Sequence, residues 1–154
     1  MTVRAKDLYD RMCEYLEKKG WKFEKEDDEL IIHFVVSGDD IPMLMILKID
    51  SDRNLIRLLS PIPFNFDEDK RIDGAIATCY VSNRLADGSF AYDIRDGSVA
   101  FRLTASFANS RIGTDLIDYM IACSSFTVDA YNDKFLALNK GMISITDFIN
   151  KGEK

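Results

Sequence analysis

The sequence is poor in the side chains that most often carry catalysis or bind metals. It has one histidine, His33, and three cysteines that lie far apart, so it offers neither several imidazoles nor a Cys-x-x-Cys pair for zinc. Its eight glycines are spread along the chain, and none belongs to a glycine-rich loop that would hold a phosphate. A Gly-x-Ser-x-Gly nucleophile motif is also absent from the sequence. The sequence therefore predicts no catalytic site, no metal site and no cofactor.

One acidic segment begins like a calcium-binding loop. Asp50, Asp52 and Asn54 have the spacing of the first three ligands. The sharp turn of such a loop needs glycine where this sequence has Leu55, and the bidentate glutamate is replaced by Pro61. We therefore interpret this segment as a β-turn.

The charge and the apolar runs exclude two classes of partner. The formal net charge is −6, which disfavours binding to a phosphate backbone, so no nucleic acid is expected. No apolar run approaches the roughly 18 residues of a membrane span, and the N-terminus lacks the apolar core of a signal peptide. We expect a single domain over residues 1–154, in the cytoplasm and without a membrane partner. The odd number of cysteines indicates plain core thiols rather than a disulfide framework.

Hydrophobic periodicity predicts an α+β fold, with an antiparallel sheet packed against helices. The expected order is α-ββββ-α-ββ-α, which lacks the alternation of a parallel sheet. The predicted helices cover residues 2–19 or 6–19, 67–85, 109–140 and 145–150, and the predicted strands cover residues 21–24, 30–36, 43–49, 55–59, 90–95 and 99–105.

Local signals set several boundaries and details of these elements. Asp96-Gly97 predicts a tight hairpin turn, and Asp67 predicts the N-cap of the second helix. Pro61 and Pro63 predict the end of the sheet. A kink is expected near Ser124-Ser125 in the long helix. The predicted buried stripe of the second helix consists of Ile72, Ala75 or Ile76, Cys79, Tyr80 and Asn83.

The middle strands are apolar on both faces, unlike an antiparallel sheet with one wet face. Ile32 and Phe34 lie on one side of a strand whose other side carries Ile31 and Val35. We therefore expect a cover on both faces of the sheet centre, supplied on the second face by a helix of this chain or by a second copy. Near the end of these strands, Phe64 and Phe66 would either anchor a partner or pack under the adjoining helix, and we favour packing.

Turn and packing residues in the second half carry a resemblance to a known family. They are Asn83, Gly88-Ser89-Phe90, Asp93, Asp96-Gly97 and Phe101-Arg102, followed downstream by Asp129-x-Tyr131 and Leu138. Together with the order of elements, they resemble the YbjN-like family, which is named for a proposed role in bacterial sensory transduction and whose fold is similar to type III secretion chaperones. The resemblance implies an interaction module that dimerises and binds extended segments of other proteins, and it assigns no catalytic residues.

The sequence thus favours a non-enzymatic protein-interaction module, chaperone- or adaptor-like and homodimeric, with a protein partner of unknown identity. The alternatives are a small-ligand-binding regulator with a pocket between the sheet and the long helix, and an enzyme of a type without a recognisable motif. The candidate partner-binding residues lie on the first helix and the middle strands: Tyr9, Met12, Ile31, Val35, Leu44 and Ile46.

Overall fold

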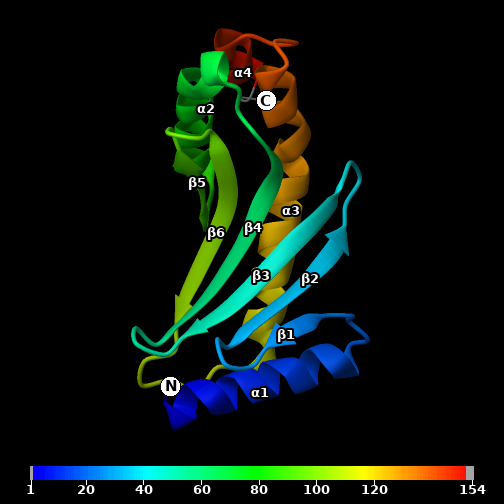
Figure 1. The fold of residues 1–154 in the computed structure, drawn as a ribbon, viewed down its shortest axis with the longest axis vertical. Helices are drawn as coiled ribbons and strands as arrows, with labels where there is room; N and C mark the ends of the chain where they lie inside the picture. Colours follow the sequence, from blue (N-terminus) through cyan, green and yellow to red (C-terminus); the bar gives the residue numbers. More distant parts are fainter. Residues whose placement is uncertain (1, 152–154) are drawn as a thin grey trace.

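A computed structural model describes residues 2–151 and contains one antiparallel sheet flanked by helices (Figure 1). The helical elements are α1 (Val3–Lys18), the 3-10 turn η1 (Glu68–Lys70), α2 (Arg71–Arg84), α3 (Thr114–Asn139) and α4 (Ile145–Lys151). The strands are β1 (Glu24–Glu26), β2 (Ile31–Ser37), β3 (Pro42–Asp50), β4 (Leu55–Asn65), β5 (Ser89–Asp93) and β6 (Ser98–Ser106).

The sheet has the strand order β1-β2-β3-β4-β6-β5, so the β5–β6 hairpin extends the edge of the β1–β4 meander. The predicted fold class and element order are confirmed. The first strand was predicted over residues 21–24, but it begins at Glu24 and contains only the residues Glu24–Glu26. The turn between β5 and β6 contains Gly97 at a φ of 75°, as the Asp-Gly signal predicted.

The main core lies between one face of the sheet and the helices. Figure 1 shows α3 crossing behind the sheet, with α1 at one end of the molecule and α2 and α4 at the other. Strand residues of alternate parity point into this core, as the period of two requires. The fully or almost fully buried strand residues include Ile32, Phe34, Met45, Leu47, Ile56, Leu58, Phe101 and Leu103.

The two prolines of β4 do not end the sheet, which corrects the sequence prediction. The β3–β4 pairing ends at Ile46 and Leu59, and beyond that point β4 remains paired with β6 alone. If the same register continued, Pro61 would lie opposite Leu44, but it has no N–H to donate. Instead, Ser60 Oγ donates a hydrogen bond of 2.8 Å to the Leu44 carbonyl oxygen. The prolines therefore lie where β4 has become an edge towards β3, which is where a sheet tolerates them.

The buried stripe of α2 was predicted on the wrong side of the helix. The structure buries Gly74, Ala77, Thr78 and Val81, whereas most of the predicted stripe faces outward: Ile72 is 70% exposed, Ile76 is 42% exposed, and Cys79 and Asn83 are also exposed. Small side chains face inward because the helix approaches the Phe66 and Tyr92 side chains closely at Gly74. The prediction of three core cysteines is therefore wrong for Cys79.

The long helix α3 runs from Thr114 to Asn139 without the predicted break. Ser124 is fully buried, and Ser125 Oγ donates to the Ala122 carbonyl within the helix, so neither serine interrupts the helical ladder. The helix starts later than predicted because Asn109 adopts a φ of 54°, which is incompatible with a right-handed helix.

Candidate functional site

The face of the sheet opposite α3 carries an exposed apolar stripe across three neighbouring strands. Val35 on β2 pairs with Leu44 on β3, and Ile46 on β3 pairs with Leu59 on β4. Val35 is 56% exposed, Leu44 38% and Leu59 36%, while Ile46 is half-buried. We call these four residues the open-face stripe. Cross-strand neighbours on one face lie about 5 Å apart, so the four side chains form one continuous surface.

No helix within residues 2–151 covers the middle of this face. The exposure of Val35 and Leu44 shows it directly, and in Figure 1 the long helix α3 lies behind the sheet. Of the two covers that the sequence left open, a helix from the described part of the chain is therefore excluded. The apolar side chains on this face are therefore accessible to a partner outside residues 2–151.

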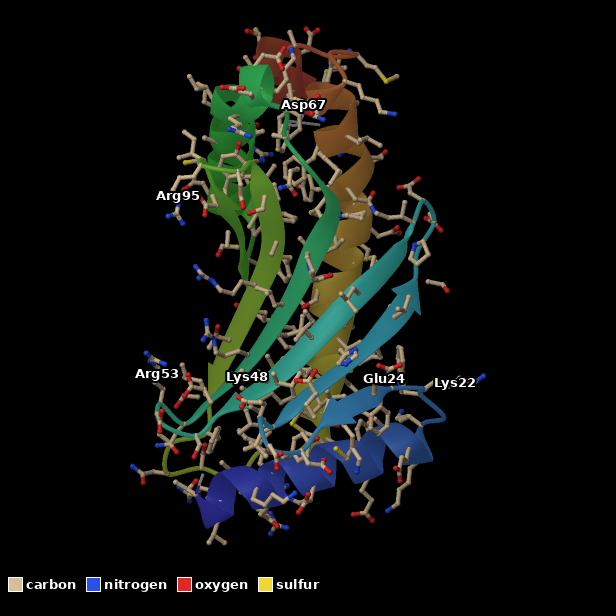
Figure 2. All side chains as sticks on the ribbon, viewed as in Figure 1. Lys22, Glu24, Lys48, Arg53, Asp67 and Arg95 are labelled. Atoms are coloured by element: carbon tan, nitrogen blue, oxygen red, sulfur yellow. The ribbon has the colours of Figure 1, made fainter. Side chains whose placement is uncertain are left out.

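Three basic side chains, Lys48, Arg57 and Arg102, lie beside the stripe on the same face of the sheet. Figure 2 labels Lys48 near the lower end of β3. Lys48 pairs directly with Arg57 on β4, and Arg102 on β6 pairs with Leu59 of the stripe. Lys48 and Arg57 are half-buried, and Arg102 is exposed. Like charges at directly opposed positions of a sheet are destabilising. The register therefore places two mutually repelling positive charges beside the apolar stripe. This local positive charge contrasts with the net negative charge of the chain.

The nearest acid does not neutralise this cluster. The Asp50 carboxylate Oδ2 accepts from Arg53 Nη1 at 2.9 Å and lies 3.9 Å from Arg57 Nη1. Hydrogen bonds from the Arg53 side chain and backbone hold the pKa of Asp50 below its usual value. Asp50 is therefore ionised but bound mainly to Arg53, so much of the positive charge of Lys48 and Arg57 remains.

The structure divides the sequence-predicted partner-binding residues into two groups. Ile31, Val35, Leu44 and Ile46 share the open face, with Val35 and Leu44 exposed and the two isoleucines half-buried. Tyr9 and Met12 are only 1% and 2% exposed, because the apolar stripe of α1 is the surface that packs into the core.

The buried Tyr9 serves a structural purpose at the α1–sheet contact. Its hydroxyl donates a 2.8 Å hydrogen bond to Asp27 Oδ1. Burial, followed by this hydrogen bond, raises the pKa of Tyr9. Tyr9 and Met12 are therefore not part of the exposed candidate surface. That the four strand residues bind a partner stays a prediction.

Sequence reasoning missed four residues of this surface: Leu59, Lys48, Arg57 and Arg102. The consecutive Leu58 and Leu59 show the same two-sided pattern as the middle strands and could have identified Leu59. The basic cluster depends on strand register, which sequence periodicity does not specify.

Other chemistry finds little support in residues 2–151. The described residues contain no group of three or more His, Cys, Asp or Glu side chains that could hold a metal ion. His33 lies on β2 between Glu24 of β1 and Ile46 of β3, and its Nε2 atom is 3.7 Å from Glu24 Oε2. Burial raises the pKa of the Cys13 thiol, which makes it a poor nucleophile.

Within residues 2–151, no helix combines the length and apolar character that crossing a membrane requires.

The fold is that of the type III secretion chaperone-like class, in which an antiparallel sheet is packed with helices. It is similar to the crystal structure of YbjN, a proposed transcription regulator from E. coli, with a TM-score of 0.61 and 11% identity over 82% of this chain and 92% of that chain. It is equally similar to ExsC in the crystal structure of the ExsC-ExsE complex, with a TM-score of 0.61 and 14% identity over 86% of this chain and 96% of that chain.

These likenesses confirm the fold that the sequence resemblance implied, and at such low identities they show the fold alone. No protein-family model matches the sequence, and none of the curated proteins matches it.

Proposed function

We propose that the protein is a non-enzymatic interaction module, chaperone- or adaptor-like, whose open sheet face binds an extended segment of another protein. The observation that carries this proposal is the open-face stripe, an apolar surface that no helix of residues 2–151 covers. Contiguous exposed apolar surface with a polar border is typical of protein-interaction sites. The similarity to ExsC, whose structure was solved in a complex with ExsE, supports the same kind of role.

The charge beside the stripe supports a proposal about the chemistry of the partner segment. Lys48 and Arg57 oppose one another and lack sufficient anionic partners, so an acidic side chain between them would relieve their repulsion. Electrostatic complementarity of this kind selects partners and speeds association. We therefore propose that the bound segment combines apolar residues for the stripe with acidic residues for the basic cluster.

Replacing Val35 and Leu44 together with lysine should abolish partner binding without unfolding the protein. Both side chains are exposed in the free chain, so the substitutions are expected to lower the free energy of unfolding by no more than about 2 kcal/mol, which includes the repulsion between the two opposed lysines. Placing two charges in the centre of a desolvated interface should weaken binding at least about tenfold. The measurement is affinity capture from host lysate, quantified by mass spectrometry, followed by the dissociation constant for the captured protein.

The matched control for this experiment is Phe126→Lys. Phe126 is 79% exposed and lies on α3, away from the open-face stripe, so this variant should bind like the wild type. A second variant, Lys48→Glu with Arg57→Glu, should weaken binding of an acidic segment, and its remaining binding should strengthen rather than weaken as salt is added. Equal binding by the folded Val35→Lys, Leu44→Lys variant would contradict the proposed surface.

A homodimer is a second proposal, favoured by the apolar outer side of α2. Two isoleucines of α2 are exposed, Ile72 to 70% and Ile76 to 42%. Ile94, which follows β5, is 54% exposed and lines one groove together with Cys79 of α2. We expect light scattering coupled to size-exclusion chromatography to give twice the mass of one chain for the wild type, and one chain for Ile72→Glu with Ile76→Glu. Phe126→Glu should remain dimeric, and a wild-type monomer at high concentration would refute this proposal.

A further inference from the structure

A separate pocket is lined by residues of α2, α3 and α4 and of the loop before α4. Figure 1 shows α2 and α4 at the end of the molecule away from α1. Its volume is about 260 Å³, close to the lower limit of small-molecule sites. Its apolar lining comes from Val81 of α2, from Phe148 of α4 and from Ile143 in the loop that precedes α4. The space between the sheet and α3, where the sequence hypothesis placed a ligand, is instead filled by buried side chains such as Leu58 and Phe101.

The polar side chains of this pocket are mainly cationic. Arg84, Lys134 and Lys151 line it together with a single acid, Asp147. The Arg84 guanidinium lies 5.3 Å from the centre of the Tyr80 ring, and Lys134 Nζ lies 5.1 Å from the centre of the Tyr131 ring. Within residues 2–151, none of the three basic side chains forms a salt bridge. The pocket is therefore locally positive on a chain with a net charge of −6.

Tertiary contacts hold the walls of this pocket in place. Phe148 stacks on Phe135 of α3 with ring centres 5.9 Å apart, and the Tyr80 hydroxyl donates a 3.0 Å hydrogen bond to the Ile149 carbonyl oxygen. The Ser144 Oγ accepts from the Asp147 backbone N–H at 3.0 Å at the start of α4. A seven-residue helix would not be stable alone, so these contacts fix α4 as the third wall. The site is thus preformed, which lowers the entropic cost of binding.

We propose that this pocket binds a small amphipathic organic anion, with its apolar body against Val81 and Phe148 and its anionic head beside Arg84 and Lys134. The lining matches both halves of such a ligand, since arginine and lysine bind carboxylates and phosphates through charge-assisted hydrogen bonds. The volume limits the ligand to a short chain or a single ring system. This site is distinct from the open sheet face and does not depend on the proposed protein partner.

The test is a ¹H–¹⁵N NMR titration of the full chain with sodium octanoate and, in a second arm, with hexyl phosphate. An amphiphile of about ten non-hydrogen atoms should bind with a dissociation constant in the high-micromolar to millimolar range. Chemical-shift changes should centre on Val81, Ile143 and Phe148. The tighter of the two probes identifies the preferred head group. Octan-1-ol, which lacks the charge, and acetate, which lacks the tail, should each bind at least about tenfold more weakly.

Variants separate this pocket from non-specific binding. Arg84→Glu with Lys134→Glu should raise the dissociation constant at least about tenfold, whereas Arg95→Glu, whose side chain is 88% exposed outside the pocket, should leave it unchanged. If the charge reversal unfolds the chain, the milder Arg84→Gln with Lys134→Gln replaces it and should raise the constant severalfold. Shifts that centre on the open sheet face, equal binding of octan-1-ol, or unchanged binding by the folded pocket variant would each overturn the proposal.

Discussion

Replacing Phe135 with alanine is expected to lower the free energy of unfolding by about 3–5 kcal/mol, the cost of removing a fully buried phenyl ring. The Phe135 side chain has no exposed surface. Its ring contacts Phe90 edge-on at a centre distance of 5.0 Å, contacts Phe66 at 6.3 Å and stacks on Phe148. It therefore joins β5, the β4–η1 connection and α4 to the long helix. Urea denaturation followed by circular dichroism measures the loss.

The same helix supplies the control for this experiment. Phe126 is 79% exposed on α3, so Phe126→Ala makes the same chemical change without opening a cavity. We expect its effect on the unfolding free energy to stay within about 0.5 kcal/mol. Similar costs for the two variants would mean that the aromatic cluster does not determine stability at this end of the molecule.

The two proposed binding sites rest on different parts of the core. The open-face stripe is backed by the buried strand residues Phe34, Met45 and Leu58, which lie on the opposite face of the same strands. The pocket rests on Phe135 and Phe148, because their stacking positions α4. A substitution of Phe148 that leaves the protein folded should therefore weaken small-anion binding more than binding of a protein segment. An experiment can in this way test the two proposed sites independently.

The sequence predicted those features that depend on local patterns. The alternation around Phe101 and the Asp96-Gly97 turn specify the last hairpin whatever the rest of the chain does. The two-sided pattern of Ile31 to Val35 likewise indicated that both faces of the sheet centre carry apolar side chains. These patterns were sufficient for the fold class, and they identified four residues that share the open sheet face, whose role in binding stays a prediction.

The features that the sequence did not predict depend on tertiary geometry. The inward side of α2 was missed because apolar periodicity favours the large Ile72 and Ile76. The helix instead buries small residues such as Ala77, and at Gly74 it approaches the Phe66 side chain too closely for a larger residue. Pro61 lies within a strand because β3 has already separated from β4 at that point. The pocket near α4 is formed by side chains that lie between Tyr80 and Lys151 in the sequence, and no local motif connects them.

A second large effect is expected for Gly97→Ala, which should lower the unfolding free energy by about 2–4 kcal/mol through backbone strain and a direct clash. Gly97 has a φ of 75°, in the left-handed region. A Cβ atom there would lie 2.3 Å from the Phe66 carbonyl oxygen and 2.9 Å from the Phe66 nitrogen. Both are backbone atoms, so no side-chain rotation relieves the contact. The Phe66 N–H also donates a 2.8 Å hydrogen bond to the Gly97 carbonyl oxygen, which ties the two segments together.

Gly20→Ala isolates the clash from the backbone strain. Gly20 has nearly the same φ, 78°, and no atom lies within 4 Å of the position that a Cβ would take. This control should therefore carry only the cost of the left-handed conformation, about 1 kcal/mol. The difference between the two variants, measured by urea denaturation, is the energy of the Gly97–Phe66 contact. Because Phe66 leads from β4 into η1 and α2, a large difference would show that this contact sets the position of the helix that forms one wall of the pocket. Equal costs would instead mean that the β5–β6 turn shifts freely and that α2 is positioned by its own packing.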